Sequence, residues 1–371
     1  MLTTLTGPKT LCTGRYRPIA RSWSILLNMI LVCSGCSKPN PAEPQATAMI
    51  PRVGNRIIFT AKYADGTSGI DWCEADGSRR QTLLKSDWRV TAQPYAGRMI
   101  ADKPTTDVVL GGPDSLCIFD LSRREPISVD AELVDMFTSI SLSPDGTQVL
   151  KRLGLGYLSI VSVDGYAVRN LADRVDYLTR PVISPDGSEV AYLGVDWSTP
   201  PKNHPSIHIV STRGLGDRDL GDTVDRVAGV DLAWSPDGQR LAYADLHLQN
   251  RVDLITINID GGGRQNLSNG VDSDFHPQWS PDGSRIAFTT GDPDGARDIV
   301  VINADGTGRR NLTTTADQNE DFVQWSPDGS KLLFLSVGSA VSLNVIDLAT
   351  GIIVTVAESV EGPAYWDYSI E

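Results

Sequence analysis

The sequence predicts an all-β fold, a seven-bladed β-propeller whose blades are four-stranded antiparallel sheets. The first observation is a repeat, because the tetrapeptide Ser-Pro-Asp-Gly occurs five times, at intervals of 41, 51, 45 and 46 residues. Such a period is typical of propeller blades or of paired-helix repeats. The second observation is local. Each copy precedes short β-branched runs flanked by turn residues, which indicates strands. The 34 Gly and 22 Pro among 371 residues also suit many turns.

Residues 1–35 have the pattern of a signal peptide of the lipoprotein type. Basic residues precede an apolar run, Trp23–Val32, which is too short to span a bilayer because about 20 residues are needed. The run leads into Ser-Gly-Cys, which resembles a bacterial lipobox and predicts lipid attachment at Cys36. The alternative is an ordinary cleaved signal with a chance cysteine. Residues 36–50 are rich in Pro and Ala, which predicts an extended tether.

Residues 51–371 are predicted to form a single propeller domain of repeated units. In each unit an inner strand leads into the Ser-Pro-Asp-Gly turn, and a second, third and fourth strand follow as a meander. A large apolar residue precedes the turn, where it would pack between neighbouring sheets. In the five clearest units this residue is Leu142, Ile183, Trp234, Trp279 or Trp325.

The five tetrapeptides are interpreted as structural turns, since a catalytic group is seldom needed five times. Proline sets φ at the second position, aspartate tolerates the third, and glycine takes the left-handed fourth position. The turn residues are Pro144, Asp145, Gly146, Pro185, Asp186, Gly187, Pro236, Asp237, Gly238, Pro281, Asp282, Gly283, Pro327, Asp328 and Gly329.

Two weaker units extend the number of blades. Asn55–Thr60 and Gly97–Ala101 match the second strands of the clear units, so the predicted number is seven, with six or eight as alternatives. No convincing inner strand precedes Asn55–Thr60. The segment Gly362–Asp367 resembles the inner strand Asp274–Ser280, and we expect it to complete the first blade and close the ring. An open array would leave unpaired strand edges.

Several motifs together resemble the propeller repeat of the TolB family. They are Trp-Ser-Pro-Asp-Gly, Arg-Ile-Ala-Phe, Asp-Ile-Val-Val-Ile-Asn-x-Asp-Gly and Asn-Leu-Thr, and Arg285–Thr313 is the best copy. The resemblance implies a propeller that binds a protein partner in the bacterial envelope. Similar propellers precede the catalytic domain of prolyl-oligopeptidase-like peptidases, but the sequence contains no Gly-x-Ser-x-Gly elbow.

These observations predict a non-catalytic binding or scaffold protein of the cell envelope. It would be a monomer, lipid-anchored on the periplasmic side of the outer membrane if the source is Gram-negative. Acidic residues outnumber basic ones by 46 to 33, for a net charge of −13. Nucleic-acid binders need a basic surface, so this class is excluded.

Chain direction divides the predicted ring into two faces. The Ser-Pro-Asp-Gly turns follow the inner strands and lie together on one face, which we call the turn face. The opposite face carries the segments that lead into inner strands and the loops between second and third strands, and we call it the loop face. Loops on a rigid scaffold commonly carry function, so the loop face is the predicted binding surface.

Carboxylates that lead into inner strands would form an acidic ring at the channel mouth on the loop face. Such a ring could attract a basic partner segment or hold a divalent cation. The alternative is ordinary solvated loop charge. The residues considered for partner binding are Asp135, Asp176, Asp272, Asp274, Glu320 and Asp321.

Trp197 is a further candidate for partner binding. It lies in the long segment Gly194–Ser206, which two prolines stiffen. An exposed tryptophan on a rigid loop is a typical interface anchor. The alternative is that Trp197 folds back onto the propeller surface.

A metal site is the alternative hypothesis for the loop face. His204, His247 and His276 fall in neighbouring blades and, with Asp274, could hold a metal. Some pectate-type lyases do chemistry on a propeller with such a site, so the competing function is a carbohydrate-active lyase. No short motif such as His-Glu-x-x-His supports it, and we expect no catalytic residue, cofactor or metal.

Cys73 and Cys117 occupy the third strands of the first two blades. Export to an oxidising compartment would permit a disulfide between them. However, side chains on one shared face point the same way round the ring, so only one thiol would meet the other's blade. We therefore expect two separate buried thiols.

Overall fold

The chain divides into two compact units, Met1–Met49 and Ile50–Glu371. The computed structural model describes residues 56–85, 87–96, 98–104, 113–121, 125–128, 139–153, 156–163, 167–176, 180–195, 205–224, 231–247, 251–268, 272–291, 296–315 and 318–367. The predicted signal peptide, Cys36 and the tether lie outside these ranges. Within them, no helix is long and apolar enough to cross a bilayer.

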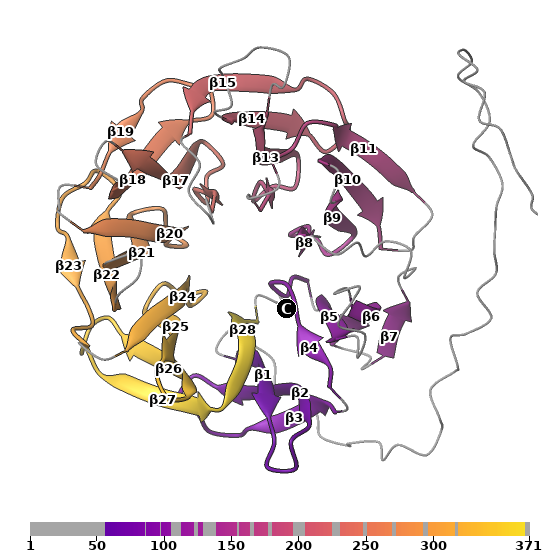
Figure 1. Ribbon diagram of the computed structural model, residues 1–371, viewed down its shortest axis with the longest axis vertical. Helices are drawn as coiled ribbons and strands as arrows, with labels where there is room; N and C mark the ends of the chain where they lie inside the picture. The colour runs from indigo at the N-terminus through magenta and orange to yellow at the C-terminus, as the bar shows by residue number, and fades with distance from the viewer. Residues whose placement is uncertain are drawn as a thin grey trace, which may run out of the picture. The chain divides into compact units, whose positions relative to one another are not determined.

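The second unit is a ring of seven four-stranded antiparallel sheets, as predicted (Figure 1). From the inner to the outer strand, blade 1 is β28 (Val360–Trp366), β1 (Arg56–Lys62), β2 (Ser68–Glu74) and β3 (Gln81–Leu84), and blade 2 is β4 (Arg89–Val90), β5 (Arg98–Pro104), β6 (Pro113–Asp120) and β7 (Glu125–Ser128). Blade 3 is β8 (Ser139–Leu142), β9 (Gln148–Leu153), β10 (Tyr157–Ser162) and β11 (Val168–Ala172), and blade 4 is β12 (Val182–Ile183), β13 (Glu189–Gly194), β14 (Ser206–Ser211) and β15 (Arg218–Thr223). Blade 5 is β16 (Ala233–Trp234), β17 (Arg240–His247), β18 (Arg251–Asn258) and β19 (Gln265–Asn266). Blade 6 is β20 (Ser273–Trp279), β21 (Arg285–Gly291), β22 (Arg297–Asn303) and β23 (Arg310–Asn311), and blade 7 is β24 (Asn319–Trp325), β25 (Lys331–Val337), β26 (Val341–Asp347) and β27 (Ile353–Glu358).

Blade 1 closes the ring by combining both ends of the propeller. The C-terminal strand β28 pairs antiparallel with β1, with Ile57 opposite Trp366 and Phe59 opposite Ala364. The backbone N–H of Asp367 donates to the carbonyl of Arg56 at 2.9 Å. The prediction that the terminal segment completes the first blade is therefore confirmed.

The apolar core lies between the blades, and the tryptophans before the turns join neighbouring sheets. Trp325 of blade 7 packs against Ala287 and Ile299 of blade 6. Its indole N–H donates to the carbonyl of Gln278 in blade 6 at 2.9 Å. The Arg285 guanidinium of blade 6 lies 4.8 Å from the Trp325 ring. The indole thus combines apolar burial, a hydrogen bond and a cation–π contact at one blade interface.

The Ser-Pro-Asp-Gly segments form the predicted turns, and the fourth copy illustrates their hydrogen bonds. In the fourth copy the Ser280 hydroxyl donates to Asp282 at 2.6 Å, and the Gly283 N–H donates to the Ser280 carbonyl at 2.8 Å. Gly283 has φ 70°, which is the left-handed region that glycine adopts easily. Bonds from Ser280 and Ser284 lower the pKa of Asp282 to about 2. The matching serine–aspartate bonds occur in all five copies.

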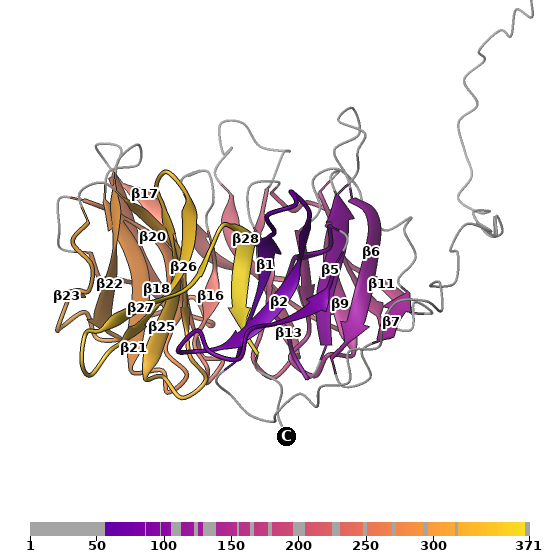
Figure 2. The same cartoon turned by 90° about the horizontal axis from the view of Figure 1, so that it is seen from below.

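The ring has the two predicted faces. In Figure 2 the arrow of β28 runs downward, so the turn face is at the bottom and the loop face is at the top. Figure 1 looks onto the loop face, with the inner strands around the centre of the ring.

Cys73 and Cys117 are both buried and unbonded, as expected. Cys73 packs in a cluster with Leu333 and Val345 of blade 7, whereas Cys117 packs in another cluster with Trp72 of blade 1. Each thiol therefore faces the preceding blade rather than the other thiol. Burial raises the pKa of each to about 12.

Candidate functional site

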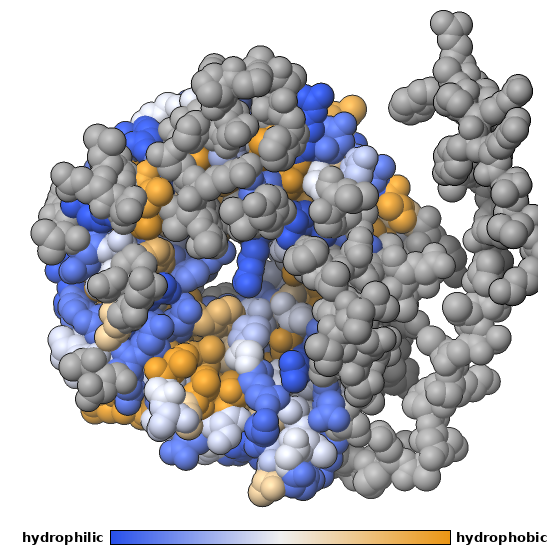
Figure 3. Space-filling model, in the orientation of Figure 1, coloured by the Kyte–Doolittle hydropathy of each residue, from blue (hydrophilic) through white to orange (hydrophobic). Residues whose placement is uncertain are grey.

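A cavity of about 330 Å³ lies among the inner strands at the centre of the ring. Its lining comes from β12, β16, β20, β24 and β28 and from the residues just before them. The lining residues are Arg180, Val182, Asp231, Leu232, His276, Gln278, Asp321, Phe322, Val323, Gln324 and Tyr365. Figure 3 shows an opening at the centre of the loop face, and hydrophilic residues border part of it.

Four of the lining residues hold one register position in four successive blades. Arg180, Asp231, His276 and Phe322 each stand three residues before the apolar residue that precedes a Ser-Pro-Asp-Gly turn. The fold repeats at this position, but the chemistry does not, since a cation, a carboxylate, an imidazole and a phenyl ring follow one another. Because the residue at this position differs among these four blades, the blade architecture does not require one residue type there. The side chains at this position can therefore form a binding site.

Local backbone geometry directs two of these side chains. His276 and Phe322 have φ of 53° and 57°, in the left-handed region that bulky residues seldom adopt. Both lie where the pairing of the inner strand with its neighbour shifts register, in β20 and β24. Bulges re-aim side chains, and strained residues cluster at functional sites. The repeated bulge brings both residues into the cavity wall.

His276 is held between two carboxylates. Its Nδ1 lies 2.5 Å from Asp231 Oδ2, and its Nε2 lies 3.6 Å from Asp321 Oδ1. Burial lowers the pKa of His276, but the hydrogen bond and charge of Asp231 and the charge of Asp321 outweigh it, so the pKa is raised above its usual value. The cavity therefore favours a positively charged imidazole beside the two carboxylates.

Aromatic and amide groups complete the cavity. The rings of Phe322 and Tyr365 meet edge to face, with centroids 5.4 Å apart. Gln278 and Gln324 line the same wall. The Oε1 atom of Gln324 is buried and accepts no hydrogen bond from the described residues. Since buried polar atoms are nearly always bonded, this oxygen is available to a donor on a ligand.

The structure brings only part of the predicted acidic ring to the cavity. Asp321 lines it, whereas Asp272 is exposed outside it. Asp135 lies outside the described residues. Three other carboxylates are buried within the blades, namely Asp176, Asp274 and Glu320.

Two of these buried carboxylates, Asp274 and Glu320, accept hydrogen bonds from other groups of the protein. Both oxygens of Asp274 accept hydrogen bonds from the Arg309 guanidinium at 3.1 Å, and one also accepts from Ser268. Glu320 accepts from Thr313 at 2.6 Å and from Thr315 at 2.7 Å, while burial raises its pKa. These side chains stabilise the blades and do not form a ring with Asp321.

The histidines considered for a metal site are only partly described. His204 and Trp197 lie outside the described residues, and for His247 only the backbone, at the end of β17, is described. His276 contacts Asp231 and Asp321, while Asp274 is bonded to Arg309. Among the described residues, no three His, Cys, Asp or Glu side chains are grouped so that they could hold a metal ion.

Sequence reasoning missed most of the cavity. Arg180, Asp231 and Phe322 were not candidates, because each looks unremarkable within its own blade. The available signal was their common position, three residues before the packed apolar residue. Gln278, Gln324 and Tyr365 immediately precede the packed apolar residue in three blades and give a second set of cavity side chains at one repeated position.

Solved structures with the same fold have diverse activities. TolB from Acinetobacter baumannii matches with a TM-score of 0.50 and 13% identity, over 84% of this chain and 66% of that one. A puromycin-hydrolysing peptidase of Mycobacterium tuberculosis gives 0.56 and 15%, over 83% and 54%. Oligogalacturonate lyase from Vibrio parahaemolyticus gives 0.55 and 11%, over 82% and 87%. At these identities the likeness concerns the fold alone.

The sequence itself gives the family. No curated protein matches the chain. Residues 150–364 match the family described as PD40, the TolB beta propeller domain, and this range covers more than half of the chain and runs from blade 3 to β28 of blade 1. The chain therefore belongs to the TolB β-propeller domain family.

Proposed function

We propose that this protein is a non-catalytic binding protein of the bacterial cell envelope, which engages a protein partner through the loop face. The observation that carries the proposal is the central cavity, where one repeated position presents Arg180, Asp231, His276 and Phe322. A cation, carboxylates, aromatic rings and a free amide oxygen can together recognise the mixed polar and apolar groups of a polypeptide segment.

The charge of the cavity suggests which segment it takes. Asp231 and Asp321 bracket His276, and Arg180 lies on the adjoining wall. A partner segment with an amide or cationic group could bond to Gln324 Oε1 and the carboxylates, while an apolar side chain packs on Phe322 and Tyr365. The binding energy would be concentrated in a few residues, as in other interfaces.

Site-directed photo-crosslinking tests this function. A photo-reactive phenylalanine analogue is placed at Phe322 in cells that express the full chain. We expect a protein adduct of one defined mass, and we expect Asp321→Ala or Arg180→Ala to abolish it. The same analogue at Leu215, which is exposed between the third and fourth strands of blade 4 on the turn face, serves as the control. An adduct that forms equally well in the cavity variants would contradict the proposal.

Two further measurements separate this function from its alternatives. Turnover of oligogalacturonate by the purified protein, lost on His276→Ala, would favour a carbohydrate lyase instead. For the envelope location, Cys36→Ser should release the protein from the membrane fraction of detergent-free lysates. Retention of that variant at the membrane would remove the lipid anchor from the proposal.

A further inference from the structure

Polar side chains tie the outer strands of several blades to the next blade. Arg169 of blade 3 donates to the carbonyl of Thr212 in blade 4 at 2.8 Å. Arg310 of blade 6 donates in the same way to Leu348 in blade 7 at 3.1 Å. In both cases the acceptor lies in the turn between the third and fourth strands of the next blade. We call this contact the inter-blade latch.

The latch residues share one register position. Arg169 pairs with Ile160, and Arg310 pairs with Val301, at matching places on the third strands. Gln265 of blade 5 holds the same position and donates to the carbonyl of Asp305 in blade 6 at 3.2 Å. In blade 4 the position is also an arginine, Arg218, which instead pairs with Glu189 of its own blade.

Blade 7 has no donor at this position. The residue is Val354, which pairs with Val345 and is 37% exposed. Its neighbours Ile352 and Ile353 are exposed as well. A valine side chain cannot donate a hydrogen bond to the turn of blade 1, so the latch is missing at the interface between blades 7 and 1.

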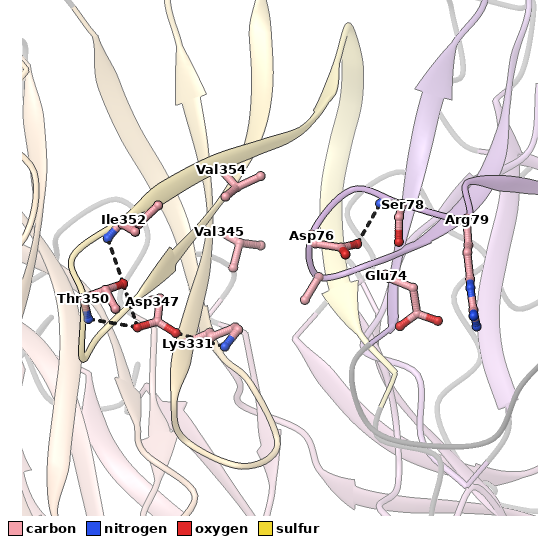
Figure 4. Close-up of a pocket in the computed structure, with 11 residues that line it drawn as sticks. Glu74, Asp76, Ser78, Arg79, Lys331, Val345, Asp347, Thr350, Ile352 and Val354 are labelled. Carbon is pink, nitrogen blue, oxygen red and sulfur yellow. Dashed lines mark hydrogen bonds and ion pairs between the residues drawn. The ribbon is translucent and has the colours of Figure 1, made fainter.

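A groove of about 640 Å³ lies at this interface (Figure 4). Its apolar wall consists of Val345, Ile352 and Val354 from blade 7, and its other wall is the turn of blade 1 around Glu74 and Asp76. Figure 4 shows the valines and the two carboxylates on opposite sides of the gap.

The charges of the groove favour a cationic occupant. Lys331 pairs with Asp347 at 3.1 Å, so these two charges balance each other. Hydrogen bonds from Ser78 hold the pKa of Asp76 below its usual value, which keeps this carboxylate ionised. Arg79 lies beyond Glu74 as seen from Val354 in Figure 4.

We propose that the groove binds an arginine side chain from an extended segment of a protein partner. The alkyl stem of this arginine would pack on Val345 and Val354. Its guanidinium would reach the turn of blade 1, as the guanidinium of Arg310 reaches the turn of blade 7 at the interface between blades 6 and 7. Within the described residues β27 pairs only with β26, so its outer edge is open to a partner strand. This docking surface is separate from the central cavity.

A peptide copied from the chain's own latch provides the probe. The labelled peptide Thr-Gly-Arg-Arg-Asn-Leu-Thr, which corresponds to residues 307–313, is titrated against the full chain and followed by fluorescence anisotropy. We expect saturable binding. Replacing the arginine that corresponds to Arg310 by norleucine keeps the stem and removes the donors, and it should weaken binding about tenfold or more.

A substitution that places an arginine of the protein itself in the groove gives a sharper test. Val354→Arg should supply the missing latch, raise the melting temperature and weaken peptide binding about tenfold or more. Val337→Arg introduces the same side chain at an exposed site outside the groove and should leave the affinity unchanged. Glu74→Gln combined with Asp76→Asn should weaken binding without closing the groove.

Three results would overturn the proposal. They are no saturable binding to the full chain, equal affinity for the arginine and norleucine peptides, and full affinity in Val354→Arg. Because Asp321→Ala alters only the central cavity, peptide binding that survives it and fails in Val354→Arg assigns the effect to the groove. Failure of the proposed function at the cavity would leave these results unaffected.

Discussion

The two faces of the propeller use the same repeat in opposite ways. On the turn face, five copies of one tetrapeptide make the same serine–aspartate bond, so repetition there serves the architecture. On the loop face, one register position presents Arg180, Asp231, His276 and Phe322 in successive blades. In a repeat protein, sameness at a position indicates a structural role, whereas difference at a fixed position indicates a candidate for recognition.

The largest expected effect concerns β28, the C-terminal strand that closes the ring. Deleting Gly362–Glu371 removes Trp366 and Ala364 from a buried cluster and leaves β1 without its inner neighbour. We expect the cooperative unfolding transition to disappear, because an open ring exposes a sheet edge and apolar surface. Circular dichroism during urea and heat denaturation measures this, and an unchanged transition would show that closure does not hold the ring together.

A matched pair of substitutions separates the two faces. Asp282→Ala on the turn face removes bonds to Ser280 and Ser284, which should lower the free energy of unfolding by about 1–3 kcal/mol and leave partner crosslinking intact. Asp321→Ala on the loop face should cost about 1 kcal/mol or less and abolish crosslinking. Urea midpoints and crosslinking yields are measured for both. The reverse assignment of effects would break the comparison.

The smallest expected effect is a pH dependence at His276. Its pKa is raised in the folded state, so the protonated ring stabilises the fold below its unfolded pKa near 6.5, and this contribution is lost as pH rises through the folded pKa. Wild type should therefore exceed His276→Gln in stability by about 1 kcal/mol or less at about pH 5.5, and by less at about pH 8.5. Asp231 and Asp321 favour the charged ring, and Arg297 opposes it.

Urea midpoints at the two pH values test this dependence. Asp231→Asn serves as the control, because it removes the carboxylate that bonds to Nδ1 of His276. In that variant the effect of His276→Gln should vary less with pH. A stability difference that grows as pH rises would contradict the assignment.

The architecture could be predicted because its signals are local and repeated. Each turn needs only four residues with fixed backbone preferences, and the packed residue before it recurs at the same spacing. The closure of the ring could also be predicted, because Gly362–Asp367 has the pattern of an inner strand without the strands that normally follow. The separate burial of Cys73 and Cys117 followed from the direction in which one sheet face points around the ring.

The site could not be predicted to the same degree because it is assembled from several blades. Asp274 and Glu320 were expected to lead into the inner strands and to face the channel mouth, but both lie within strands, since β20 begins at Ser273 and β24 at Asn319. The direction of each side chain is fixed within a strand. Asp274 therefore points to Arg309 and Glu320 points to Thr313, and neither points into the channel. A local sequence pattern does not reveal the register shift that turns His276 into the cavity.

The pairing of β1 with β28 also constrains how the molecule folds. Ile57 and Trp366 are neighbours in space although more than 300 residues separate them in the chain. Contacts between such distant residues cost much loop-closure entropy, and proteins rich in them fold slowly. During synthesis, the first blade has to wait for its innermost strand until every other blade has been translated. The N-terminal blade is therefore the last to be completed, and the inner edge of β1 stays unpaired until the C-terminal strand has been made.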